Sequence, residues 1–170
     1  MTETDLTRDI LTLCQQHGAM IATAESCTGG MVAAALTDIA GSSAMIDRGY
    51  VTYSNAAKAD MLAVDPEVIQ RNGAVSEDVV RAMASGALAR IDHDGPRLAV
   101  SISGIAGPGG GSAEKPVGLV WFGLASRFGN RLNLMAENKV FDGDRLAVRQ
   151  AAMLHALGML RDELQDPTRG

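Results

Sequence analysis

The chain has 170 residues, of which 46% are hydrophobic and only 4% aromatic, and it carries a formal net charge of −5 at pH 7. This length predicts a single compact domain over residues 1–170, with a core of aliphatic side chains and methionine. The acidic balance and the lack of a Lys/Arg cluster argue against nucleic-acid binding, and no apolar run is long enough for a secretion signal or a membrane span. We therefore expect a soluble, cytoplasmic protein.

The first third of the chain predicts two strands and two helices. Residues 5–16 carry apolar side chains at helical spacing and predict an N-terminal helix. Residues 19–24 form a short apolar run that predicts a strand, and residues 31–39 again predict a helix. Residues 44–53 favour a second strand, because they end in side chains that prefer β structure.

The middle third predicts helices. Ser54 is placed to cap a short helix that runs to Leu62, and Pro66 allows another brief helix. Ser76 begins a longer helix to Arg90, with acidic residues in its first turn. Connections of this kind carry the chain from one strand of a sheet to the next.

The last third predicts three strands followed by a helix. Residues 97–103 and 117–125 are apolar runs of strand length, and residues 130–141 are a third strand of a meander. Residues 144–164 carry apolar side chains at helical intervals. The order of elements predicts a three-layer α/β/α domain, in which a mixed sheet is covered by helices on both faces. The strand order does not follow from this pattern.

A hydroxyl and a thiol stand at the predicted strand-to-helix turn of residues 25–30, which we call the nucleophile turn. Backbone N–H groups at a helix start favour an anion, so such a turn suits an oxyanion or a phosphate. The turn lacks the Gly-x-Ser-x-Gly pattern of serine hydrolases. In the alternative interpretation Ser26 or Thr28 only caps the helix, while Gly29 and Gly30 permit tight packing.

Lys58 lies one helical turn beyond Ser54 and Asn55, on the side of the preceding strand end. A lysine whose pKa is lowered by burial would accept the proton of Ser26, with Tyr53 relaying or orienting it. In the alternative interpretation Lys58 is an ordinary solvated helix residue and Tyr53 is half-buried.

The segment 104–112, which we call the glycine loop, has five glycines and one proline between two predicted strands. Its backbone can approach a ligand closely, although a plain connection is the alternative. The segment matches neither the dinucleotide fingerprint nor the Walker pattern, which argues against a dinucleotide fold and a nucleoside triphosphatase. Arg145, at the start of the last predicted helix, is a candidate to hold a phosphate, whereas Asp142 and Asp144 are better explained as caps.

The three histidines and two cysteines show no metal-ligand spacing, so we expect no metal site and no disulfide.

Seven segments together resemble the CinA C-terminal, nicotinamide-nucleotide amidohydrolase family. They are residues 23–30 (TAESCTGG), 39–43 (IAGSS), 49–58 (GYVTYSNAAK), 73–77 (GAVSE), 101–112 (SISGIAGPGGGS), 115–118 (KPVG) and 143–145 (GDR). They occur in order over nearly the whole chain. The resemblance implies hydrolysis of nicotinamide mononucleotide to nicotinic acid mononucleotide and ammonia, without a cofactor or metal.

The resemblance also implies roles for single residues. Ser26 would be the nucleophile, Lys58 the base and Tyr53 their partner. The residues implied to bind nucleotide or oxyanion are Thr28, Gly29, Gly30, Ser42, Ser43, Asn55, Gly107 and Arg145, with Arg145 and Ser42 as candidates for the phosphate contact. Many relatives carry a further N-terminal domain linked to nucleotide pyrophosphate hydrolysis, an activity that we do not expect here.

Several alternatives stay open. Cys27 is a rival nucleophile, because a thiolate at a helix start would have a lowered pKa. A second alternative to the amidohydrolase is a non-catalytic nucleotide-binding module that regulates a partner. A short-chain dehydrogenase-like enzyme fits poorly, because the spacing of Tyr53 and Lys58 is one residue too long and the glycine fingerprint is missing. An Ala- and Met-rich helical surface is compatible with a homo-oligomer, and we favour a homodimer.

Overall fold

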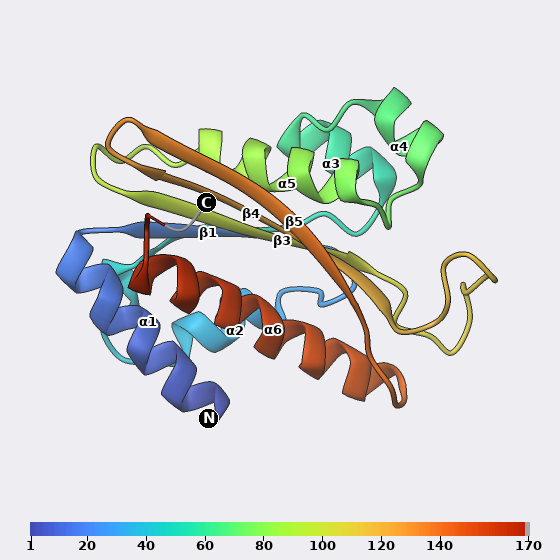
Figure 1. The fold of residues 1–170 in the computed structure, drawn as a ribbon, viewed down its shortest axis with the longest axis horizontal. Helices are drawn as coiled ribbons and strands as arrows, with labels where there is room; N and C mark the ends of the chain where they lie inside the picture. Colours follow the sequence, from blue (N-terminus) through green and yellow to red (C-terminus); the bar gives the residue numbers. More distant parts are fainter. Residues whose placement is uncertain (169–170) are drawn as a thin grey trace.

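The computed structural model describes residues 1–168, which form a five-stranded mixed sheet between two layers of helices (Figure 1). The strands are β1 (Met20–Glu25), β2 (Ile46–Val51), β3 (Arg97–Gly104), β4 (Leu119–Phe128) and β5 (Arg131–Val140). Their order is β2-β1-β3-β4-β5. The first three strands are parallel, while β4 and β5 are antiparallel to their neighbours. The predicted mixed sheet is confirmed.

Helices cover both faces of the sheet. They are α1 (Glu3–His17), α2 (Met31–Thr37), α3 (Asn55–Leu62), α4 (Pro66–Asn72), α5 (Glu77–Ala89) and α6 (Arg145–Gln165), and a short 3₁₀ turn, η1, spans Ser42–Ala44. Figure 1 shows α1, α2 and α6 on one face and α5, with α3 and α4 beside it, on the other. Each layer closes over its own buried apolar cluster. The three-layer α/β/α prediction is therefore confirmed.

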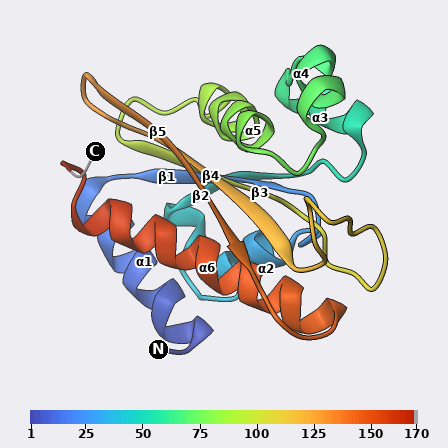
Figure 2. The same cartoon turned by 45° about the vertical axis from the view of Figure 1, so that its right-hand side comes forward.

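Parallel strands bring their carboxyl ends to one edge of the sheet, where ligands bind in many open α/β folds. The nucleophile turn follows β1, Thr52 follows β2 and the glycine loop leaves β3. The connection 105–118 projects beyond this edge, near the start of α6 (Figure 2). Segments that lie far apart in the sequence therefore meet at one edge.

The predicted strand boundaries need two corrections. The second strand ends at Val51 rather than at Tyr53, so that Thr52 and Tyr53 belong to the connection leading into α3. The strand predicted over 117–125 spans Leu119–Phe128 instead. Gly118 has a φ of 93°, and a Cβ there would lie 2.2 Å from the carbonyl oxygen of Phe141, so the chain turns at Gly118 before the strand begins.

No helix within residues 1–168 is long and apolar enough to cross a bilayer.

Candidate active site

Ser26 is the first residue after β1, and both its backbone and its side chain are engaged. Its N–H donates to the carbonyl of Ile102 in β3 at 3.0 Å, which continues the pairing of the two strands by one residue. Its side-chain oxygen is the acceptor of a 3.1 Å hydrogen bond from Nζ of Lys58. The residue is 9% exposed. The sheet therefore holds Ser26 in place and leaves it only a narrow opening to solvent.

Lys58 reaches Ser26 from the first turns of α3, and its side chain is buried. Nζ donates to the carbonyl of Thr52 at 2.7 Å and to that of Tyr53 at 3.4 Å, besides the Ser26 hydroxyl. All three partners are neutral oxygens. Burial lowers the pKa of Lys58 from 10.5 to about 8, because it removes water from the ammonium and these neutral oxygens compensate the charge only in part.

The Ser26 and Lys58 pair has the two properties that activation of a hydroxyl needs. The nucleophile and the base lie within hydrogen-bond distance, and a pKa near 8 leaves part of the lysine population neutral at physiological pH. The arrangement can move a proton from Oγ to Nζ without a histidine. The prediction that these residues meet is confirmed in geometry, whereas their catalytic roles stay predictions.

Cys27 is a poor alternative nucleophile in this structure. It is 6% exposed, and burial raises the pKa of its thiol to about 11, although Arg149 and Arg145 act in the opposite direction. We expected a helix start to lower this pKa. Burial outweighs that effect, so the thiol stays protonated near neutral pH.

Glu25 is a residue that the sequence analysis missed as a supporting group. Its carboxylate is fully buried and accepts hydrogen bonds from the Thr28 hydroxyl at 2.7 Å and from the N–H groups of Val32 at 2.9 Å and Ala33 at 3.1 Å. The side chain therefore reaches forward along the chain and satisfies the start of α2.

This contact occupies part of the helix start that we expected to hold an anion, and the binding roles of Thr28, Gly29 and Gly30 stay predictions. Two of the first N–H groups of that helix already face the Glu25 carboxylate, and the hydroxyl of Thr28 is engaged with it. Gly29 and Gly30 have φ values of 61° and 104°, so both adopt the left-handed conformation that favours glycine. The tight path of the turn thus accounts for both glycines, and the side chain of Thr28 supports the turn from within.

Tyr53, Gly107 and Arg145 come together at the mouth of the site. The guanidinium of Arg145 donates from Nη1 to the carbonyl of Gly107 at 2.7 Å and from Nη2 to the Tyr53 hydroxyl at 3.1 Å. Tyr53 is 61% exposed and meets Lys58 through its carbonyl, not through its phenol. The direct relay from the phenol to Lys58 that we predicted is therefore absent, and the phenol lines the rim with Arg145.

Arg149 is a second residue that the sequence analysis missed. Its guanidinium donates from Nε to the carbonyl of Cys27 at 2.9 Å and from Nη2 to that of Thr28 at 3.3 Å. It stands four residues after Arg145, so the two arginines share one face of α6. That spacing was the signal in the sequence, because two arginines at the start of an apolar helix point to one anionic or carbonyl-rich surface.

Ser42 and Ser43 do not join the site within this chain. They lie in η1, just before β2 begins, whereas Ser26 follows the end of the neighbouring parallel strand. The two segments therefore lie at opposite edges of the sheet. Our expectation that both serines contact the same ligand as Ser26 needs correction for a single copy of the chain.

Asn55 and the glycine loop lie at the correct edge. Asn55 is the first residue of α3 and is exposed, next to the cap that Ser54 forms. The connection after β3 is fixed at its base, where Ile105 pairs with Leu119, and near its tip, where Nζ of Lys115 donates to the carbonyl of Asn72 at 2.6 Å. Lys115 thus ties this connection to the end of α4.

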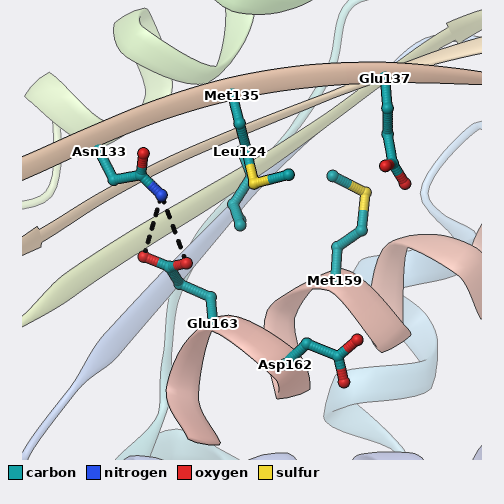
Figure 3. Close-up of a pocket in the computed structure, with 7 residues that line it drawn as sticks. All are labelled: Leu124, Asn133, Met135, Glu137, Met159, Asp162 and Glu163. Carbon is teal, nitrogen blue, oxygen red and sulfur yellow. Dashed lines mark hydrogen bonds between the residues drawn. The ribbon is translucent and has the colours of Figure 1, made fainter. Parts of the chain in front are cut away.

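A hollow of about 420 Å³ lies elsewhere, between α6 and the strands β4 and β5 (Figure 3). Its lining residues are Leu124, Asn133, Met135, Glu137, Met159, Asp162 and Glu163. Figure 3 shows the amide of Asn133 turned toward Glu163, whose carboxylate also accepts from Ser126. Neither Ser26 nor Lys58 lines this hollow, so it is separate from the pair described above. Within residues 1–168, no three His, Cys, Asp or Glu side chains gather closely enough to hold a metal ion.

Known proteins are similar to this chain over almost its full length. The profile of the CinA C-terminal domain matches residues 3–164. The nicotinamide-nucleotide amidohydrolase PncC of Escherichia coli K12 is 56% identical over 146 residues, which cover 85% of this chain and 84% of that protein. The protein of the same name from Enterobacter agglomerans is 50% identical over 163 residues, covering 95% and 96%.

A solved structure agrees with these matches. The competence/damage inducible protein CihA of Agrobacterium tumefaciens superposes with a TM-score of 0.86 at 48% identity, and the match covers 96% of each chain. The sequence profile, the relatives and the fold all point to one family. This chain belongs to the CinA C-terminal domain family.

Proposed function

We propose that this protein hydrolyses the carboxamide of nicotinamide mononucleotide to nicotinic acid mononucleotide and ammonia. The observation that carries the proposal is the 3.1 Å hydrogen bond from the buried amine of Lys58 to the Ser26 hydroxyl. The names of the PncC relatives, which are 50 to 56% identical, support the choice of substrate.

In the first half of the reaction, neutral Lys58 takes the proton of Ser26 as Oγ attacks the carboxamide carbon. The tetrahedral intermediate collapses with cleavage of the C–N bond. The Lys58 ammonium gives its proton to the leaving nitrogen, which departs as ammonia and leaves an ester on Ser26.

In the second half, Lys58, again neutral, takes a proton from water as the water oxygen attacks the ester carbon. The bond to Oγ breaks, and Ser26 recovers its proton from Lys58. The ester carbon becomes that of a carboxylic acid, which turns into the carboxylate by losing its proton to solvent or to the released ammonia. Every proton transfer before that step is assigned to one buried amine, so the scheme needs neither a cofactor nor a metal.

The rim of the site suits a nucleotide. Arg145 is exposed and presents a planar group of N–H donors that can pair with a phosphate, while it holds Gly107 and Tyr53. We assign the phosphate contact to Arg145. The phenol of Tyr53 and the backbone of the glycine loop would line the nucleotide, with Asn55 as a further contact.

The first test is ammonia release from the purified protein with nicotinamide mononucleotide, with a chelator present throughout. Turnover that Ser26→Ala abolishes in a folded protein, and that the chelator does not affect, supports the serine amidohydrolase. Nucleotide binding without ammonia release would instead favour a regulatory binding module. Loss of activity in Cys27→Ala with activity kept in Ser26→Ala would reassign the nucleophile.

We also propose that the enzyme is a cytoplasmic homodimer that returns the nucleotide to NAD synthesis. Support for self-association comes from apolar side chains exposed near the site, Val140 at 59% and Leu146 at 55%. The molar mass of the protein as it leaves a size-exclusion column, measured by light scattering, tests the dimer. A monomeric mass at micromolar concentration would refute it.

A further inference from the structure

The first turns of α6 carry two guanidinium groups that hold different parts of the site. Arg145 holds the glycine loop and the connection after β2, as described above. Arg149 contacts only the nucleophile turn, where it donates to the carbonyls of Cys27 and Thr28 at 2.9 and 3.3 Å. These two carbonyls come directly after Ser26. The contacts of Arg149 therefore end on the backbone that carries the nucleophile.

Arg149 fixes one peptide unit together with Ser26. The carbonyl of Thr28 and the N–H of Gly29 belong to the same planar trans peptide, so they point in opposite directions. The carbonyl accepts from Arg149, and the N–H donates to the carbonyl of Ser26 at 3.0 Å. The N–H of Ser26 donates a hydrogen bond to the carbonyl of Ile102 in β3. The backbone between residues 26 and 29 is therefore held between β3 and α6.

The Glu25 carboxylate and the Arg149 guanidinium both hydrogen-bond to the nucleophile turn, but not to each other. Glu25 accepts hydrogen bonds from N–H and O–H groups inside the turn, whereas Arg149 donates to carbonyls of the same turn. No salt bridge within residues 1–168 joins Glu25 to Arg149. Removing Arg149 would therefore leave the carbonyls of Cys27 and Thr28 without their charged donor and free the turn on that side only.

We propose that Arg149 is a positioning residue for Ser26, and that the phosphate of the substrate meets Arg145 instead. Both arginines use two guanidinium nitrogens within the chain, but both contacts of Arg149 are backbone carbonyls of the nucleophile turn and its side chain is half-buried, whereas one partner of Arg145 is the exposed phenol of Tyr53. Arg145 is exposed at the rim. The inference rests on the proposed amidohydrolase function of Ser26 and Lys58 and divides the work of two neighbouring arginines.

The test compares Arg149→Met, which keeps an unbranched side chain but removes the guanidinium, with Arg149→Lys, which keeps the charge but loses the planar group. Both kcat and KM are measured with nicotinamide mononucleotide and with nicotinamide riboside, which lacks the phosphate. Arg149→Met is expected to lower kcat about 10- to 100-fold on both substrates, because a small displacement of a reacting group has effects of this size, while KM changes less than about threefold. Arg149→Lys should recover part of the loss.

The matched control is Arg161→Met, on the same helix but paired with Asp162 away from the site, and it should keep wild-type kinetics. Two results would overturn the proposal. One is a rise in KM for the mononucleotide alone with kcat preserved, which would make Arg149 the phosphate ligand. The other is unchanged kinetics on both substrates.

A second measurement does not depend on turnover. Cys27 is 6% exposed and sits in the turn that Arg149 holds, whereas Cys14 is completely buried in α1. In Arg149→Met, iodoacetamide should modify Cys27 at least about tenfold faster than in the wild type, with Cys14 as the internal control for global unfolding. Wild-type protein that releases no ammonia would refute the proposed function, while this labelling still decides the role of Arg149. An unchanged Cys27 rate would show that the turn stays in place without Arg149.

Discussion

Nζ of Lys58 lies 3.1 Å from Oγ of Ser26, although the two residues are 32 positions apart and belong to different elements. The lysine reaches the serine from α3, and the carbonyl of Thr52, which follows β2, accepts a hydrogen bond from Nζ at 2.7 Å. Burying an amine without a carboxylate partner lowers the free energy of unfolding, so this contact reduces the stability of the fold. The predictions below follow from it and from the residues around it.

Replacing Lys58 by methionine should lower kcat for nicotinamide mononucleotide by about 10²- to 10⁴-fold, the usual contribution of a general base. Methionine keeps the apolar part of the side chain, so the variant should fold. Ammonia release measures the effect, with Lys139→Met on the exposed end of β5 as the control. Wild-type kcat in a folded Lys58→Met protein would remove lysine from the mechanism.

The activity should rise with pH. Lys58 must be neutral to accept the proton of Ser26, and burial places its pKa at about 8. Below that pH kcat/KM should increase about tenfold per pH unit, and above it the increase should level off. A profile of kcat/KM from pH 6 to 9.5 measures this dependence. A flat profile across the range would contradict the assignment of Lys58 as the base.

The stability of Lys58→Met relative to wild type should also depend on pH. The pKa of Lys58 falls from 10.5 in the unfolded chain to about 8 in the folded protein, so the unfolded chain binds more protons between these values. The penalty for the buried ammonium is complete below pH 8 and is relieved as the pH rises toward 10.5. Lys58→Met should therefore gain most in urea midpoint at pH 7 and less at pH 10. An equal difference at both pH values would argue against this shift.

Replacing Arg145 by methionine should raise KM for nicotinamide mononucleotide about tenfold or more, because a charged hydrogen bond contributes about 1.5 to 3 kcal/mol. KM for the riboside should change little, since that substrate has no phosphate. Steady-state kinetics with the mononucleotide and with the riboside measure the two KM values. If both KM values rise equally, Arg145 acts by holding Tyr53 and Gly107 rather than by binding phosphate.

Replacing Glu25 by glutamine should lower the free energy of unfolding by about 1 to 3 kcal/mol, because the new NH₂ group would face N–H and O–H donors in a fully buried position. Urea unfolding at pH 7.5 measures the change. Glu67→Gln, on the exposed first turn of α4, is the matched control and should stay within about 0.5 kcal/mol of wild type. An equal, small effect of both substitutions would show that the Glu25 carboxylate is dispensable for the turn.

The elements of this fold could be predicted because their signals are local. The apolar run before Ser26 and the glycines after it mark a strand and a turn, and the helical spacing of α6 is visible over its whole length. The strand order could not be predicted, because it depends on pairing between distant segments such as β1 and β3. Ser42 and Ser43 were placed with Ser26 by the family resemblance, which does not say at which end of the sheet a segment lies.

Ser26 and Lys58 could be identified from residue type and motif, whereas their supports could not. Glu25 caps the N–H groups of residues seven and eight positions later, and no local capping pattern covers that distance. Arg149 acts on backbone carbonyls more than 120 positions away, so its role appears only when α6 is in place. The phenol of Tyr53 accepts a hydrogen bond from Arg145, 92 positions away, which no local pattern around Tyr53 indicates.

The position of the two arginines in the chain gives activity a dependence on the order of synthesis. A nascent polypeptide exposes Ser26 and Lys58 from the ribosome well before Arg145 and Arg149 are made. The guanidinium groups that hold the nucleophile turn, the glycine loop and Tyr53 belong to the last helix, whose apolar side chains also form part of the core on one face of the sheet. A chain that ends before residue 145 would therefore lack both arginine contacts and the apolar cover of one face of the sheet, so we expect it to lose activity through both.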